Sequence, residues 1–140
     1  MSIANGIIEL PQTRSFLRMV YECFSFRRGM KSSVEVDPDT FYNPETEFIG
    51  GRDVTFMWSR PVSRILVSNR PSITIAVEAP WTQIVKIEYG CDVRLVTLRA
   101  GRSYIINIDT KYIDYVDIKA ETYLPVDDTR ELGLKFLNVE

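Results

Sequence analysis

The strongest constraint on the fold is a series of short segments rich in Val, Ile, Thr and Tyr, which recur every eight to twelve residues from residue 53 onward. Turn residues such as Asn69-Arg70-Pro71, Pro80 and Gly90 separate these segments. This spacing is typical of antiparallel sandwiches and barrels. We therefore predict an all-β fold, a jelly-roll-like antiparallel β-sandwich of about eight strands. The predicted strands are Asp53–Trp58, Val62–Ser68, Ser72–Ala79, Gln83–Tyr89, Asp92–Leu98, Ser103–Asp109, Tyr115–Leu124 and Leu132–Val139.

Alternation within these segments indicates which side chains are buried. Ile73, Ile75 and Val77 share one face of their strand, while Thr74 and Ala76 share the other. The strongest hairpin signal joins the segments 83–89 and 92–98 through Gly90-Cys91.

The final segment is expected to complete the core. The polar turn 127–131 precedes it, and Gly133 indicates a bulge or a close backbone approach. Leu134 and Phe136 have the same parity, so we expect both to enter the core between the sheets. Lys135, Leu137 and Val139 then share the second face, which an N-terminal helix is expected to cover in part.

The N-terminal third has a different character. Ile7–Leu10 is read as an edge strand or an arm, and Thr13–Phe26 as an amphipathic helix, with a strand as the alternative. We divide the chain into an arm and helix (1–33) packed on a sandwich domain (34–140). Residues 1–33 hold five basic and two acidic side chains, a net charge of +3. A solvated helix face explains this charge best, and contact of residues 14–31 with a membrane surface is the less favoured alternative.

The segment 37–52 reads as a long polar loop, because it contains two prolines and the pair Gly50-Gly51. Its aromatic residues argue against disorder, and long loops in compact domains are often functional.

Composition excludes several kinds of chemistry. The chain of 140 residues contains no histidine, which removes histidine-dependent catalysis and histidine zinc sites. A net charge of −2 gives no general attraction to nucleic acid, and no cofactor or metal is expected. The first residues do not resemble a signal peptide, so we expect a cytoplasmic protein. Cys23 and Cys91 are therefore read as reduced core residues.

Two groups of short motifs carry a family resemblance. The first comprises Phe41-Tyr42-Asn43-Pro44-Glu45, Gly50-Gly51 and Thr55-Phe56-Met57-Trp58-Ser59. The second comprises Pro125, Asp127-Asp128 and Thr129-Arg130-Glu131-Leu132-Gly133-Leu134. In order and spacing they resemble β-sandwich accessory modules associated with bacterial glycosyltransferases and surface-polysaccharide biosynthesis proteins. Met57 departs from the pattern, because an Arg is expected before the tryptophan.

The resemblance implies a non-catalytic carbohydrate-binding or accessory module whose partner is a glycan or a glycosyltransferase. Sugar recognition uses aromatic faces together with carboxylate, amide or guanidinium groups that bond to hydroxyls. The candidate ligand-binding residues are Tyr42, Asn43, Glu45, Trp58, Trp81, Asp128, Arg130 and Glu131.

Structural roles compete with this interpretation at several positions. Trp58 is better explained as a core residue. For Asp128, Arg130 and Glu131 we favour an Asx-type turn, with Arg130 bridged to a carboxylate and fixing the last strand. Calcium binding by Asp127, Asp128 and Glu131 is a minor alternative.

Two other function classes stay open. A protein-interaction or assembly subunit would explain the basic N-terminal segment and the lack of catalytic motifs. A carboxylate-based glycan-processing enzyme would use acidic residues of the 37–52 segment, namely Asp37, Asp39, Glu45 and Glu47. The sequence leaves the sugar, the partner and the oligomeric state open.

Overall fold

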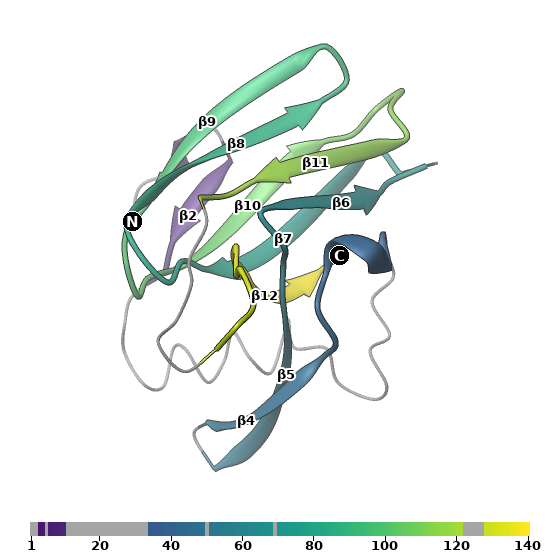
Figure 1. Cartoon of the computed structure of the whole chain (residues 1–140). Helices are drawn as coiled ribbons and strands as arrows, with labels where there is room; N and C mark the ends of the chain where they lie inside the picture. The colour runs from purple at the N-terminus through teal and green to yellow at the C-terminus, as the bar shows by residue number, and fades with distance from the viewer. Residues whose placement is uncertain (1–2, 5, 11–33, 50, 69, 122–127) are drawn as a thin grey trace.

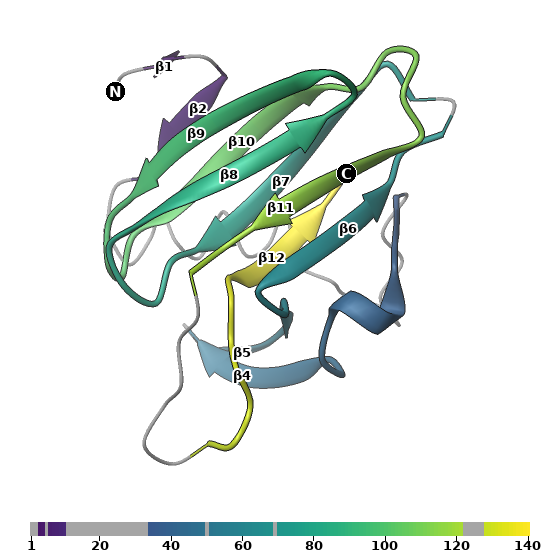
Figure 2. The same cartoon turned by 45° about the horizontal axis from the view of Figure 1, so that its top comes forward.

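The computed structural model describes residues 3–4, 6–10, 34–49, 51–68, 70–121 and 128–140, which form two antiparallel sheets packed face to face (Figures 1 and 2). The seven-stranded sheet has the order β1 (Ile3–Ala4), β2 (Ile7–Glu9), β10 (Ser103–Asp109), β7 (Ser72–Glu78), β12 (Lys135–Val139), β5 (Arg52–Trp58), β4 (Glu45–Ile49). The five-stranded sheet has the order β3 (Glu35–Val36), β6 (Val62–Leu66), β11 (Tyr115–Lys119), β8 (Gln83–Tyr89), β9 (Asp92–Leu98). A short 3-10 turn, η1 (Pro38–Thr40), is the one helical element of the described residues.

The predicted all-β architecture is confirmed, and each of the eight predicted segments contains a strand. The β8–β9 hairpin has the predicted two-residue turn, in which Gly90 has a φ of +64°. Strands β11 and β12 are shorter than predicted, ending at Lys119 and beginning at Lys135. The predicted helix Thr13–Phe26 lies outside the described residues. Strand β2 pairs with β10, so this part of the N-terminal arm belongs to the seven-stranded sheet.

The interpretation of residues 37–52 as a loop is wrong for their second half. Glu45–Ile49 forms strand β4, which pairs with β5 from Glu45↔Phe56 to Ile49↔Arg52. The strand lies at the edge of the sheet, and its residues 46–48 are exposed on both faces. An edge strand solvated on both sides needs no apolar alternation, so its sequence looks like a polar loop.

The main core lies between the two sheets. Ile73, Ile75 and Val77 contribute to it from β7, as the alternation predicts, while Ala76 faces the other way. From the five-stranded sheet, Ile65 and Ile87 are fully buried against them.

The terminal strand β12 lies inside the seven-stranded sheet, between β5 and β7. Gly133 passes so close to residues 59–60, which follow β5, that a Cβ would lie 2.6 Å from the Arg60 carbonyl oxygen. Buried Ser59 fixes this crossing: its carbonyl accepts from the Gly133 N–H at 2.8 Å, and its Oγ accepts from the Leu134 N–H at 2.9 Å. The close approach expected at Gly133 is confirmed.

The expected facing of β12 is confirmed for Leu134, Phe136 and Leu137 and is wrong for Val139. Leu134 and Phe136 are buried in the main core, and the Phe136 ring meets Phe41 edge to face at 5.0 Å. A β-bulge then interrupts the ladder between Phe136 and Asn138. Because the bulge adds one residue, Val139 returns to the main core instead of sharing the second face with Leu137.

The second face of β12 is also buried. Leu137 packs there in a smaller cluster with Val54, Phe56 and Ala76. The segment that was expected to cover this face lies outside the described residues.

The expectation that the cysteines lie in the core is wrong for Cys91. This residue occupies the β8–β9 turn, where it is exposed and free. A two-residue turn projects from the end of a hairpin, so its side chains have no sheet to pack against. Cys23 lies outside the described residues.

Truncation of Phe136 should show how far the fold depends on β12. We expect Phe136→Ala to lower the free energy of unfolding by about 3–5 kcal/mol, because it leaves a cavity in the main core. Phe48→Ala is the matched control, since the Phe48 side chain is 72% exposed, and it should be nearly neutral. Urea denaturation compares the two, and equal losses of stability would contradict a central role for β12.

Candidate functional site

Five of the eight candidate residues meet where the segment before β12 passes the start of β4. They are Tyr42, Glu45, Asp128, Arg130 and Glu131. Together with Arg60 we call them the Arg130 cluster.

Arg130 is the centre of this cluster. Its guanidinium donates from Nε and NH2 to both oxygens of Asp128, at 2.6–3.0 Å, and from NH1 to Glu45 Oε2 at 3.0 Å. Its backbone N–H also donates to Asp128 Oδ1 at 2.9 Å, which closes an Asx-type turn. The predicted turn with Arg130 bridged to a carboxylate is therefore present, and Glu45 extends the bridge to β4.

Tyr42 lies beside two guanidinium groups. The Cζ atoms of Arg60 and Arg130 lie 4.5 and 5.2 Å from the ring centroid, within the range of cation–π attraction. The Tyr42 hydroxyl donates to the carbonyl oxygen of Glu131 at 2.9 Å. The segment that leads into β12 therefore contacts Tyr42 twice, with Arg130 on the face of the ring and the Glu131 carbonyl at its hydroxyl.

The electrostatics of the cluster match this geometry. Hydrogen bonds from the Arg130 guanidinium, and then from its backbone N–H, lower the pKa of Asp128 from an ordinary 3.8 to about 2. The bonds to Asp128 and Glu45 raise the pKa of Arg130. A sugar hydroxyl would have to displace these charge-assisted bonds, so the geometry favours a structural role for the cluster.

Glu131 joins the cluster through its backbone carbonyl, and the side chains of the other three candidate residues take no part in it. Asn43 is exposed in the loop before β4. Trp58 ends β5 and packs edge to face on Phe56 at 6.3 Å, beside the smaller apolar cluster. Trp81 lies in the β7–β8 connection, which hydrogen-bonds to the β9–β10 turn through the neighbouring Ala79 and Thr82.

Two of the other acidic residues considered from sequence have structural partners. Asp37 caps η1 by accepting from the Asp39 N–H, and Glu47 pairs with Lys135 at 2.7 Å. Asp127 lies outside the described residues. Within the described part of the chain, no group of acidic or cysteine side chains could hold a metal ion.

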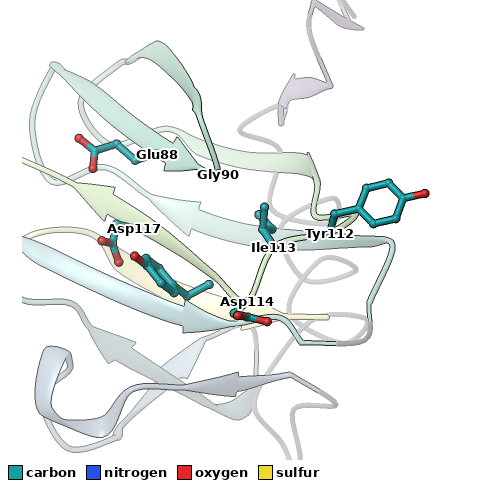
Figure 3. A pocket seen from close by; sticks show the side chains of 7 residues that line it. Glu88, Gly90, Tyr112, Ile113, Asp114 and Asp117 are labelled. Atoms are coloured by element: carbon teal, nitrogen blue, oxygen red, sulfur yellow. The ribbon is translucent and has the colours of Figure 1, made fainter.

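A cavity of about 290 Å³ lies at another place in the fold, where the β10–β11 loop meets the end of the β8–β9 hairpin (Figure 3). We call it the Tyr112 cavity. It is lined by Glu88, Gly90, Tyr112, Ile113, Asp114, Tyr115 and Asp117. Figure 3 shows Ile113 directed toward Gly90 and Tyr112 directed out to solvent. Two larger hollows, of about 510 and 480 Å³, adjoin it and share Asp114 in their lining.

Ion pairs arrange one wall of this cavity. Asp117 accepts two hydrogen bonds from Arg64, at 2.8 and 3.0 Å, and the Arg64 guanidinium lies over the Tyr115 ring at 3.9 Å. Glu88 pairs with Lys119 at 2.9 Å and Lys86 at 3.3 Å, and the hydrogen bond from Lys119 is the main cause of its lowered pKa. Asp114 is less constrained, because its carboxylate has one long bond among the described residues, from Ser68 Oγ at 3.4 Å.

The loop that carries Tyr112 is firmly attached. Buried Thr110 donates from Oγ1 to the Arg70 carbonyl at 2.6 Å and from its backbone N–H to the Pro71 carbonyl at 3.0 Å. Tyr112 is fully exposed and has a φ of +66°, a left-handed conformation that is rare for a bulky residue. Such backbone strain costs about 1–3 kcal/mol and occurs preferentially at functional sites.

Sequence reasoning did not find this cavity. Its residues come from β8, the β10–β11 loop and β11, and no motif links them. The one local signal is the presence of two tyrosines and an aspartate in the short segment Tyr112-Ile113-Asp114-Tyr115. Arg60 was also missed, because its relation to Tyr42 depends on the Phe41↔Ser59 bridge.

Comparisons with protein-family models, curated proteins and solved structures found no match to this chain. In the described residues, no helix has the length and apolar character needed to cross a membrane.

The Asp128–Arg130 pair should make stability depend on acidity. The pKa of Asp128 is lower in the fold than in the unfolded chain, so the pair stabilises the fold above about pH 4 and loses this effect as the pH falls toward 2. Asp128→Asn keeps an acceptor for the turn and removes the charge. We expect the difference between the urea midpoints of wild type and variant to be largest at pH 7 and to shrink as the pH falls from about 4 to 2, and a constant difference would contradict the ion pair.

Removing Arg130 tests whether the cluster is structural. Its side chain is 31% exposed, so we expect Arg130→Ala to cost about 1 kcal/mol of stability. Lys86→Ala, which removes a cation from an exposed pair, is the control and should cost less. Loss of glycan binding by Arg130→Ala at unchanged melting temperature would instead identify the cluster as a binding site.

Proposed function

We propose that this protein is a non-catalytic carbohydrate-binding module and that a sugar binds in the Tyr112 cavity. The observation that carries the proposal is a fully exposed tyrosine, held in a strained backbone conformation, beside a cavity lined by three carboxylates. Keeping an aromatic ring of this size in water has a cost in free energy that ligand contact would recover.

The chemistry of the cavity suits a sugar. The apolar C–H faces of a sugar ring stack on aromatic side chains. The Tyr112 ring stands in solvent at the rim of the cavity, and Tyr115, which has the Arg64 guanidinium over its ring, also lines it. Sugar hydroxyls donate to carboxylates, and Asp114 offers the least constrained carboxylate of the lining. The two adjoining hollows leave room for more than one sugar unit around the same loop.

Preorganisation supports the same proposal. The bonds of Thr110 fix the base of the β10–β11 loop, and the Val67 N–H donates to the Asp114 carbonyl at 2.8 Å. A ligand that binds to a loop already held in place pays less conformational entropy.

A glycosidase is less well supported at this site. A general acid for glycoside hydrolysis needs a raised carboxyl pKa, whereas the lysine bonds of Glu88 lower its pKa. The carboxylates of the cavity therefore suit hydrogen bonding to hydroxyls better than proton donation.

The proposal includes the finer expectations drawn from sequence. These are a jelly-roll-like topology, a cytoplasmic location and an association with bacterial glycosyltransferases in polysaccharide biosynthesis. The resemblance of residues 41–140 to accessory modules supports the association with glycosyltransferases, and the strand arrangement is compatible with a jelly-roll-like topology.

Substitution of Tyr112 by glycine separates binding from stability. Tyr112→Gly removes the ring and relieves the left-handed strain, so the melting temperature should stay equal or rise. The affinity for a sugar identified on a glycan array should fall about tenfold or more. Phe48→Ala removes another exposed aromatic ring, outside the cavity, and should bind as the wild type does. Failure of every glycan on the array to bind the wild type would refute the proposal.

A further inference from the structure

Strand β9 is the outermost strand of the five-stranded sheet in the described part of the chain, and it runs along the top of the molecule in Figure 1. Its seven residues pair with β8 in unbroken register, from Tyr89↔Asp92 to Gln83↔Leu98. An edge of this length and regularity is a template on which another strand can pair.

The hairpin geometry shows which backbone groups face outward from this edge. Residues of an antiparallel pair alternate between hydrogen-bonded and non-hydrogen-bonded positions, and a two-residue turn closes on a hydrogen-bonded pair. Tyr89↔Asp92 is that closing pair, so Asp92, Arg94, Val96 and Leu98 direct their backbone groups toward β8. The N–H and C=O groups of residues 93, 95 and 97 therefore point away from the sheet.

The side chains at these same positions are apolar or uncharged and exposed. Val93 is 57% and Leu95 67% exposed, and Thr97 is also exposed. Ile84 of β8, which is 55% exposed, pairs directly with Thr97 and lies on the same face of the sheet. Soluble proteins usually protect a sheet edge with proline, a bulge or an outward lysine, and β9 has none of these. Its one basic residue, Arg94, instead reaches inward to the Asn107 carbonyl at 2.8 Å.

We infer that β9 pairs with β9 of a second copy of this chain, antiparallel and about a two-fold axis at Leu95. This arrangement joins the two five-stranded sheets into one continuous sheet of ten strands. It does not depend on the proposed sugar binding, and it gives the assembly role considered from sequence a defined surface.

The sequence of β9 is complementary to itself in this register. Leu95 meets Leu95 of the second copy, Val93 meets Thr97, and the outward backbone groups of all three residues find partners. Arg94 lies opposite Val96 and Asp92 opposite Leu98, so no like charges face each other. If the pairing of the two β9 strands shifted by one residue, residues with outward backbone groups would lie opposite residues whose groups point toward β8, and hydrogen bonds would be lost. A shift of two residues would leave fewer residues paired.

The expected dimer is weak. A strand of seven residues is about 24 Å long, and edge pairing with a narrow apolar contact buries less than the roughly 800 Å² per partner of a standard stable interface. We therefore expect a reversible dimer with a dissociation constant in the micromolar range or weaker.

Sedimentation velocity over a concentration series tests the dimer. The wild type should form dimers as its concentration rises, and Leu95→Lys should stay monomeric with an unchanged melting temperature, because this side chain points to solvent. Val62→Lys is the matched control, since Val62 is 47% exposed on the same sheet but lies on β6, and it should dimerise normally. A wild type that is monomeric up to about 1 mM, as expected if the edge binds an extended peptide of another protein, would overturn the inference. Dimers that persist in Leu95→Lys would overturn it as well.

Cross-linking tests the register. With both native cysteines replaced (Cys23→Ser, Cys91→Ser), Leu95→Cys should be joined into dimers by a short bis-maleimide, because directly opposed residues have Cα atoms about 5.5 Å apart. With Cys23→Ser alone, the native Cys91 should not cross-link, since the two turns lie at opposite ends of the paired strands, about 27 Å apart. Cross-linking through Cys91 and not through position 95 would exclude this pairing.

Discussion

The fold depends on the insertion of β12 between β5 and β7, which makes one seven-stranded sheet from parts that are otherwise separate. Ser59 holds β12 in place at the point where Gly133 passes residues 59–60, and only a residue without a Cβ fits there. Phe136 then fills the space between the sheets against Phe41. The bulge after Phe136 lets the same short strand serve two apolar clusters, since Val139 lies in one and Leu137 in the other.

The Arg130 cluster is best understood as part of this closure. Its ion pairs join the segment before β12 to the start of β4, and Tyr42 reaches the same segment through its hydroxyl. Tyr42, Glu45 and Arg130, which were first singled out as candidates for sugar binding, therefore lie where the last strand enters the sheet.

Much of the fold could be predicted from sequence because most strands have one buried face. Where apolar side chains occupy every second position, as Ile73, Ile75 and Val77 do, the sequence itself indicates which face of the strand is buried. Strand β4 was missed because both of its faces are solvated, and Val139 was misplaced because a bulge leaves no mark in an alternating pattern. The turn at Asp128 and Arg130 was predictable because it is local. The Tyr112 cavity was not, because three separate elements form it and the strained backbone of Tyr112 has no sequence signature.

The position of β12 also has a consequence for biosynthesis. Strands β5 and β7 are made early, yet the strand that separates them is made more than fifty residues after β7. Until then, the facing edges of two apolar strands have no partner on the nascent chain. Folding of the sandwich must therefore wait for residues 135–139 to leave the ribosome, and contacts so distant in sequence form slowly. During this interval the chain is open to mispairing, so protection by a ribosome-associated chaperone would matter most before its last strand is complete.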